Sequence, residues 1–427
     1  MLDNRNAYDL SHFSFSLGAI GSLQTLSVVP IVAGDSMQLD LQGVFRLSPL
    51  RRNLTVDAQI DLFAFFVPYR HVYGSNWTDF ILQGYDESVT LGGTTITDNI
   101  FCCGTANLTG TVPTWSIAGY AQIWNRYFRD PTDASTKADD YLKDLLSTDD
   151  RRIYGEPCCY LPNLWNTGVT SELTTADYEL ASATEFDVRD LSLLKGRLKT
   201  EIMREQFGQR YNDVMRTSWG TSVSIDADQR PQLVMRNTVS LSGYDVDTTD
   251  SAGVGTWAGK SAGYASLKFP WKLFPEHGTL WIMSLVRFPT IHAFENHYLH
   301  SLAEPTYQQI AGDSELIARS APVELTPADI FYNSADATSL GRTPHSQWYR
   351  MHPNYAHPTY ANLNGFPFLE NAIDTRDDAV YIDNDEYDGV FQSTQLKHWQ
   401  SQVRVGLMAK RHIPDVMSSI FAGTGAT

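Results

Sequence analysis

Positive charge is scarce in this 427-residue chain. It has 32 lysines and arginines against 49 aspartates and glutamates, which gives a formal net charge of −17. A protein that neutralises phosphates needs an excess of cationic side chains. The composition therefore argues against a protein that neutralises nucleic acid unaided. If the chain encloses DNA, a separate basic partner or cations must supply the positive charge.

Cysteine is also scarce, and its spacing excludes two kinds of site. The four cysteines form the neighbouring pairs Cys102-Cys103 and Cys158-Cys159. A disulfide between adjacent residues is strained, and zinc sites use a CxxC spacing that this sequence lacks. We expect reduced structural thiols, no metal site and no cofactor.

Long apolar runs are missing as well. Leu62–Val67 and Leu280–Val286 are the longest, and both are far too short to cross a bilayer as a helix. The first residues show no basic segment followed by an apolar run, so no signal peptide is visible. We expect folding in a cytosol and no membrane insertion.

Aromatic residues, turn formers and period-two patterns are plentiful. Aromatics make up 12% of the chain, which also has 29 glycines and 19 prolines, a balance typical of a β-rich, loop-rich protein. From Met37 to Leu47 apolar and polar residues alternate, which predicts a half-buried antiparallel strand. Further strands are expected at about 23–32, 55–67, 279–288 and 399–408.

The segment from Thr55 to Val67 has an uneven pattern. One face is apolar throughout, whereas the other begins with Asp57, Gln59 and Asp61 and turns apolar from Phe63 onward. When one face of a strand is polar at one end and apolar at the other, another element covers the apolar end. We therefore expect something to cover its second half.

The distribution of strand patterns predicts one mainly β domain over residues 1–427. Its scaffold is expected mainly at 10–75 and 275–413, with insertions mainly at 76–274 and 290–390. Strand patterns are weak between residues 75 and 270, and a length without its own strong core is improbable as a free linker. We interpret the insertions as loops ordered by neighbouring copies.

One helical pattern lies within this middle region, at about Asp190–Ser218. It is locally basic in an acidic chain, and its candidate contact residues are Lys195, Arg197, Lys199, Arg204 and Arg210. These cations are typical of a solvated helix face, or of a contact with nucleic acid or a partner. The pattern alone leaves both interpretations open.

Two short motifs resemble ligand-binding loops without completing them. Gly253–Ser261 resembles a phosphate-binding loop, but its first required glycine falls at Val254 and no strand pattern precedes it, so we expect a flexible loop. Asp245–Asp250 resembles a calcium loop, but Asp250 stands at the position of the turn glycine. At most it predicts a weak surface cation site.

Histidines form two loose groups that lack metal-ligand spacing. The groups are His292, His297 and His300, and His345, His352 and His357. We expect surface or interface histidines. The sequence also has no nucleophile motif of the serine or cysteine hydrolases. The residues alone thus predict a large, assembled β-sandwich with aromatic-rich loops, and not an enzyme.

Collinear motifs from residue 9 to about residue 410 carry a resemblance to a known family. In the first part they are Asp9–His12, Ala33–Ser36, Arg46–Arg52 and Phe66–Gly74. In the second part they are Val234–Arg236, Ser242–Asp247, Pro275–Gly278, Val286–Pro289, Ile310–Asp313, Gln347–Arg350, Gly365–Phe368 and Phe391–Ser393. The chain resembles the major capsid protein (protein F) of phiX-type microviruses, small icosahedral bacteriophages with single-stranded DNA.

The resemblance implies a fold and an assembly. The fold would be an eight-stranded antiparallel jelly roll with long insertion loops and a few helices. Sixty copies would form a T=1 icosahedral shell around a circular single-stranded DNA genome. The protein would be a virion component that assembles in the cytoplasm of a bacterial host.

The resemblance also implies partners: other copies of the chain, a small basic DNA-binding protein, and scaffolding proteins. A spike protein stays open, because Gly208–Tyr211 resembles the spike-less gokushovirus branch as much as the phiX branch. Arg46, Arg51 and Arg52, with the basic helix, are the candidates for a surface that faces DNA or a partner. The alternative is a carbohydrate-binding or carbohydrate-active β-sandwich, which predicts a monomer rather than pentamers and shells.

Overall fold

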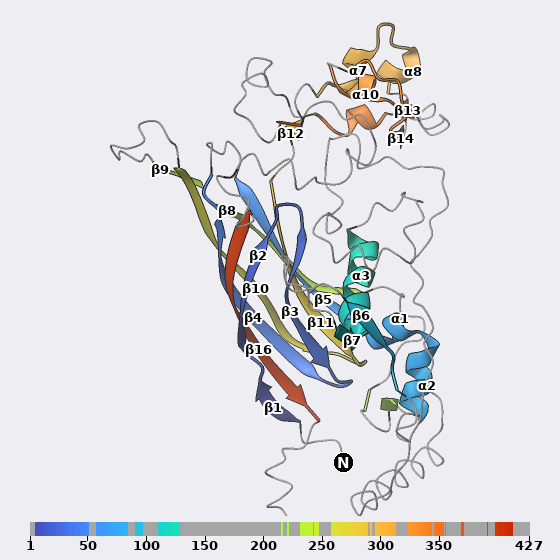
Figure 1. Ribbon diagram of the computed structural model, residues 1–427. Helices are drawn as coiled ribbons and strands as arrows, with labels where there is room; N and C mark the ends of the chain where they lie inside the picture. The colour runs from blue at the N-terminus through green and yellow to red at the C-terminus, as the bar shows by residue number, and fades with distance from the viewer. Residues whose placement is uncertain are drawn as a thin grey trace, which may run out of the picture.

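Two antiparallel β-sheets packed face to face form the centre of the molecule (Figure 1). The computed structural model describes residues 5–50, 57–83, 90–96, 110–128, 215–216, 220–221, 231–241, 243–246, 258–288, 291–292, 295–312, 323–332, 334–343, 346–353, 355, 369–370, 391 and 398–412. The first sheet contains β1 (Asn6–Asp9), β2 (His12–Gly18), β16 (Trp399–Arg411), β4 (Ser36–Leu47), β10 (Ala258–Leu273) and β9 (Gly243–Val246). The second contains β3 (Leu23–Ile31), β11 (Gly278–Arg287), β5 (Ala58–Pro68) and β8 (Gln232–Leu241), in that order.

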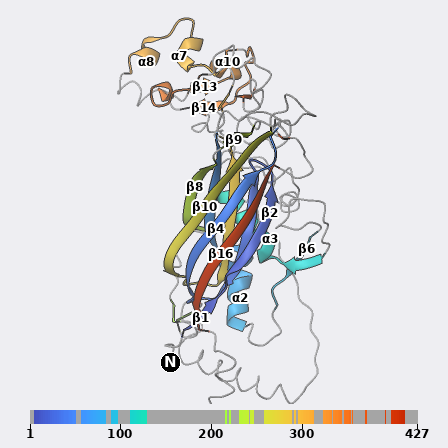
Figure 2. The same ribbon diagram turned by 90° about the vertical axis from the view of Figure 1, so that its left-hand side faces the viewer.

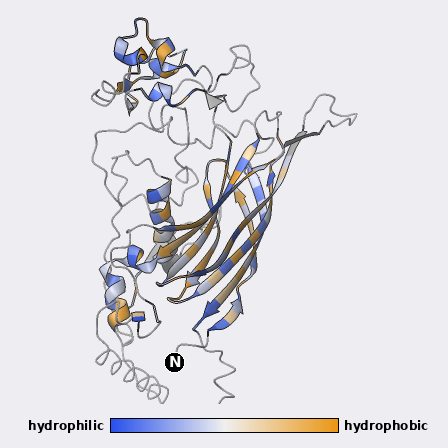
Figure 3. Ribbon diagram, turned by 180° about the vertical axis from the view of Figure 1, so that it is seen from behind, coloured by the Kyte–Doolittle hydropathy of each residue, from blue (hydrophilic) through white to orange (hydrophobic). Residues whose placement is uncertain are grey.

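Strands β4 and β16 alternate as their sequences predict. Met37, Leu39 and Leu41 of β4 point into the sandwich and are buried, whereas Gln38 and Asp40 are exposed. In β16, the buried Val403 and Val405 flank the exposed Arg404. The hydropathy colouring shows hydrophobic and hydrophilic residues interleaved along the strands (Figure 3). The period-two interpretation of these strands is confirmed.

Strands β5 and β11 are buried on both faces. They pair along their whole shared length, from Gly278 opposite Pro68 to Arg287 opposite Gln59. Of the ten residues of β11, all but Arg287 are buried. The near-continuous apolar sequences of β5 and β11 follow from this position, because both faces pack against apolar neighbours.

Three helices lie beside the second sheet, on the side away from the first (Figure 1). They are α1 (Tyr69–Tyr73), α2 (Ser75–Gln83) and α3 (Trp115–Tyr127). The ring of Phe65 lies 4.9 Å from that of Tyr127 and 6.1 Å from that of Phe128, which follows α3. The cover expected over the second half of β5 is therefore present. A small hairpin of β6 (Gly93–Ile96) and β7 (Gly110–Pro113) precedes α3.

A side-chain hydrogen bond joins the two sheets at each long edge of the sandwich. At one edge the Ser14 hydroxyl donates to the Leu26 carbonyl at 2.7 Å, which ties β2 to β3. At the other edge the Asn237 amide donates to the Ser266 carbonyl at 2.6 Å, which ties β8 to β10. Backbone groups at sheet edges can pair with other chains. These two hydrogen bonds engage part of those edges within the subunit.

A second group of short elements lies beyond one end of the sandwich, at the top of Figure 1. We call residues 295–312, 323–332, 334–343 and 346–353 the distal unit. Tyr298, Phe331 and Trp348 are buried within it. Its elements are α7 (Tyr298–Ser301), α8 (Tyr307–Ile310), β13 (Val323–Leu325), α10 (Pro327–Ile330), β14 (Gly341–Thr343) and the 3-10 helix η3 (Gln347–Tyr349). A parallel pair, β12 (Ile291–His292) with β15 (Leu369–Glu370), completes the described elements.

The mainly β class with antiparallel sheets and few helices is confirmed. Strands β8 and β10 belong to the sandwich although they fall within 76–274, the range assigned mainly to insertions. Strand β10 contains several glycines, alanines and lysines, which have little strand propensity, and pairing with β4 supplies what propensity does not. The Gly-rich stretch 253–261 also becomes strand from Ala258 onward. Within the described ranges, no helix is long and apolar enough to cross a membrane.

Candidate interaction face

The outer surface of the first sheet is uncovered by the described helices, and we call it the open face. Figure 2 shows β10, β4, β16 and β2 in front, with α3 off to one side. Side chains cross this face in rows, because the strands are in register. Leu17, Gln400 and Arg46 make one row, and Phe15, Gln402 and Val44 make the next. Each row therefore joins an apolar residue of β2 to a glutamine of β16, and the rows end at Arg46 and Val44 of β4.

Large aromatic side chains on the open face are exposed to solvent. Phe13 is 70% exposed, Phe15 is 73% exposed and Tyr264 of β10 is 58% exposed. At the far end of β10, the Lys410 amine lies 4.5 Å from the centroid of the Trp271 ring. Exposed aromatics at this density mark a contact surface more often than a bare solvated sheet.

Cations outnumber carboxylates on the open face, in contrast to the chain as a whole. The cationic side chains among its described residues are Arg46, Lys268, Arg404 and Lys410, and the carboxylates are Asp9 and Asp40. Since the full chain carries −17, this surface is a local positive area on an acidic protein.

The carboxylates of the open face are ionised next to its cations. The Lys268 amine donates to Asp40 at 3.1 Å, and this hydrogen bond is the main cause that holds the pKa of Asp40 below its ordinary value. Hydrogen bonds from Ser11, together with the charge of Arg404, lower the pKa of Asp9. Arg46 lies at the other end of β4 from Asp40, and its guanidinium faces the groove described next.

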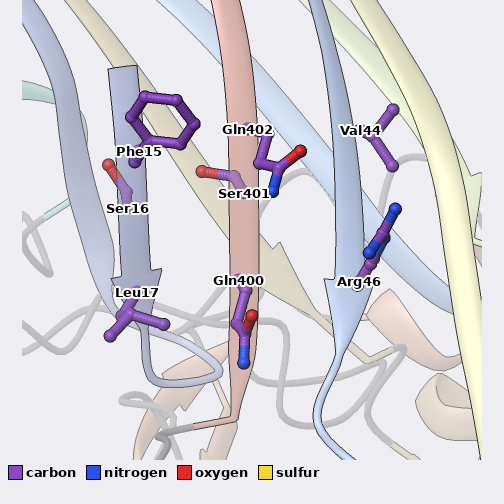
Figure 4. A pocket seen from close by; sticks show the side chains of 8 residues that line it. All are labelled: Phe15, Ser16, Leu17, Val44, Arg46, Gln400, Ser401 and Gln402. Carbon is purple, nitrogen blue, oxygen red and sulfur yellow. The ribbon is translucent and has the colours of Figure 1, made fainter.

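A shallow groove of about 260 Å³ crosses this surface (Figure 4). Phe15 and Leu17 of β2 line one side, and Val44 and Arg46 of β4 line the other. Gln400 and Gln402 of β16 lie between them and form the floor. Apolar, amide and guanidinium groups thus meet in one open groove. It can bind an extended chain that offers apolar or planar groups together with negative charge.

The structure places only one of the predicted site residues. Arg46 is exposed on β4 and lines the groove, which agrees with a surface role. Arg51, Arg52, Lys195, Arg197, Lys199, Arg204 and Arg210 lie outside the described residues. Sequence reasoning missed Phe13, Phe15 and Tyr264 as contact candidates. The signal was present in the alternation Phe13-Ser14-Phe15-Ser16-Leu17, but its apolar side would ordinarily be taken as the buried one.

A second cavity lies at the end of the second sheet and has a volume of about 420 Å³. Arg70 and Glu276 line it and form a two-point ion pair, with N–O distances of 3.1 and 3.3 Å. The Tyr127 hydroxyl donates to the Pro231 carbonyl beside it at 2.6 Å. These contacts join α1 and α3 to the segments around 231 and 276, which is a structural role.

Comparison with known proteins assigns the chain to a family. A family model described as "Capsid protein (F protein)" matches residues 2–154 and 166–421. The chain belongs to the capsid protein F family. It is 39% identical over 425 residues to capsid protein F of Enterobacteria phage phiK and 38% identical over 427 residues to that of Escherichia phage alpha3, with 97% of each chain covered in both cases.

A third F-family relative, capsid protein F of Escherichia phage G4, is 36% identical over 422 residues, which covers 98% of this chain and 97% of the relative. The protein is therefore a structural capsid protein of the phiX type, a component of a virion, and not an enzyme. As a capsid protein it assembles with copies of itself into a shell.

Proposed function

We propose that this F-family chain builds a T=1 icosahedral shell from sixty copies, and that the shell encloses a circular single-stranded DNA genome. The observation that carries the proposal is the 36–39% identity to F capsid proteins across about 97% of the chain. Residues 1–427 form one jelly-roll domain in this proposal. The order of the eight long strands supports it. One sheet runs β2-β16-β4-β10 and the other runs β3-β11-β5-β8. Numbered along the chain, these are strands 1-8-3-6 and 2-7-4-5, which is the order of a jelly roll.

The open face is the surface that this proposal directs toward DNA inside the shell. Its cations attract phosphates, and exposed rings such as Phe13 and Phe15 offer stacking surfaces for unpaired bases. The acidic remainder of the chain repels nucleic acid, so the positive area selects one orientation. The seven other predicted cations, from Arg51 to Arg210, are proposed to serve the same inward surface or a partner.

Further proteins complete the proposed particle. Sixty copies bring roughly a thousand negative charges, so added cations must balance the charge, and in this proposal a small basic DNA-binding protein supplies part of them. Scaffolding proteins would guide assembly in the cytoplasm of the bacterial host, and a spike protein stays an open alternative. Co-expression with and without such partners, followed by electron microscopy, tests the assembly. Closed shells of sixty subunits are expected, and a stable monomer that binds glycan would overturn the proposal.

A matched pair of variants tests the DNA-facing surface. Arg46→Ser removes a groove cation, whereas Arg350→Ser removes an exposed arginine in the distal unit. Fluorescence anisotropy with single-stranded DNA over a salt series should show weaker binding and a salt slope smaller by about 1 for Arg46→Ser only. Equal DNA binding by both variants would show that the open face does not bind DNA. Lost shell formation with unchanged DNA binding would assign the face to contacts between copies.

A further inference from the structure

Three histidines from two segments meet in the distal unit. The ring centroid of His297, just before α7, lies 5.6 Å from that of His300 and 5.7 Å from that of His352. His352 follows η3, so the chain returns to α7 after more than fifty residues. Sequence spacing did not group these residues, because His352 and the other two belong to different loose clusters.

The hydrogen bonds of His297 require a neutral ring. The backbone amide of Leu299 donates to Nδ1 at 3.3 Å, so this nitrogen must carry a lone pair. Nε2 lies 3.0 Å from the carbonyl oxygen of Trp348, which only accepts, so Nε2 carries the hydrogen. One tautomer of neutral imidazole satisfies both bonds, whereas imidazolium cannot accept at Nδ1. Protonation therefore removes the side-chain cap of α7.

The same ring joins α7 to the segment that holds the distal unit together. Trp348 is buried, stacks on Tyr298 with 4.6 Å between ring centroids, and donates from its indole nitrogen to the Gln309 carbonyl at 3.0 Å. The neighbouring Tyr349 hydroxyl donates to the Ile310 carbonyl at 2.7 Å. The 3-10 helix η3 thus fastens α8, and the bond from His297 to the Trp348 carbonyl fastens α7 to η3.

Burial and two neighbouring histidines disfavour the protonation of His297. Burial is the main cause that lowers its pKa; the bond to the Trp348 carbonyl raises it, and the neighbouring His300 and His352 lower it further. On α10, Asp329 accepts from the hydroxyl and amide of Thr326 and acts electrostatically on Tyr298. Glu295 precedes the cluster and is buried.

We propose that His297, His300 and His352 form an acid-sensitive latch on α7: neutral His297 caps α7 through Nδ1, and protonation of the cluster breaks that cap and places like charges side by side. A histidine whose pKa is lowered by folding stabilises the folded form above its ordinary pKa of about 6.5, and this contribution is lost as the pH falls below that value. Acid therefore loosens the distal unit, while the sandwich, which lacks this latch, stays folded.

Hydrogen exchange read by mass spectrometry on the full chain tests the latch. Exchange is compared from about pH 7.5 to about pH 5 after correction for the intrinsic pH dependence of amide exchange. Peptides covering 296–311 and 346–353 should exchange several-fold faster at the acidic end. Peptides from β4 and β16 should not change, which reports that the fold is intact.

Three variants assign the effect to the cluster. His297→Asn keeps a capping oxygen but cannot be protonated near neutral pH, so the distal peptides should lose their pH response. His352→Gln removes a neighbour that lowers the pKa of His297, so the response should shift to higher pH. His12→Gln is the control, since His12 bonds to Leu10 and Ser27 in the sandwich, and it should leave the response unchanged. A wild-type chain with equal distal protection across the range, or a response that survives in His297→Asn, overturns the latch.

Discussion

The two outer surfaces of the sandwich differ in what covers them. Over the second sheet lies α3, and the buried side chains beneath it include Phe63, Phe65 and Trp281. We call this surface the covered face. Over the first sheet no described helix packs, and Phe13 and Phe15 stand in solvent. Similar apolar side chains thus contribute to folding on one face and are available for binding on the other.

The largest expected difference comes from truncating a phenylalanine on the covered face. Phe65→Ala removes a ring that is 1% exposed and contacts Phe63, Tyr127 and Phe128. We expect the free energy of unfolding to fall by about 3–5 kcal/mol. The substitution leaves a cavity between the sheet and α3, and these two elements cannot move together to fill it. Denaturant unfolding of the purified subunit measures it. If Phe65→Ala lowered the free energy of unfolding as little as Phe15→Ala on the open face, α3 would not cover this part of the sheet.

A charge cluster on the covered face gives the next effect, and it depends on pH. Asp61 is 1% exposed, accepts from Arg287 at 2.8 Å and from Arg236 at 3.1 Å, and is also bonded by Thr238. Burial raises its pKa, but the Thr238 hydrogen bond and the two arginines outweigh burial and hold the pKa below the ordinary value. Asp61→Asn should cost about 2 kcal/mol at neutral pH, because it leaves buried donors poorly matched.

The sign of the pH dependence follows from the lowered pKa of Asp61. Its contribution to the free energy of unfolding is present above the ordinary aspartate pKa of about 3.9 and is lost as the pH falls through the lower folded value. Unfolding measured from about pH 6 to about pH 3 should therefore show the wild type and Asp61→Asn converging in acid. Parallel curves would show that the carboxylate charge contributes nothing.

A glycine in α3 gives a smaller effect with an unusual sign. A Cβ added at Gly119 would lie 2.7 Å from the Trp281 ring, so the helix sits directly on the sheet at this point. Alanine normally stabilises a helix by about 1 kcal/mol relative to glycine. Here we expect Gly119→Ala to lower the free energy of unfolding by about 1 kcal/mol net, because crowding exceeds that gain. Stabilisation, measured as a raised midpoint of thermal unfolding, would show that α3 stands farther from the sheet.

The sequence predicted which residues of β4, β5 and β16 are buried better than it predicted the residues of the open face. Alternation located β4 and β16, and the apolar switch at Phe63 predicted the cover over β5. In β2 the same rule gives the wrong side: Ser16 is buried, and Ser14 bonds to Leu26, while the phenylalanines face outward. Period two tells which residues share a face, but not which face is buried.

The remaining misses have physical causes outside the local pattern. Strand β10 contains glycine, alanine, serine and lysine with little strand propensity, and its position depends on pairing with β4 from Arg46 to Ser36. The histidine cluster depends on a chain reversal that brings His352 beside His297. Neither signal is local in sequence. Arg46, by contrast, was a candidate because its motif and its alternating strand are both local.

The smallest effect on stability is expected on the open face, where it separates folding from binding. Phe15→Ala removes a ring that is 73% exposed, so little apolar surface returns to water on unfolding. We expect less than about 0.5 kcal/mol of change in the free energy of unfolding. The same variant should weaken single-stranded DNA binding by about 1–3 kcal/mol if a base stacks on the ring. A large loss of stability would mean that Phe15 is buried within the folded subunit. If folding and DNA binding are both unchanged, the ring is assigned to a contact between copies, and the variant should then fail to form shells.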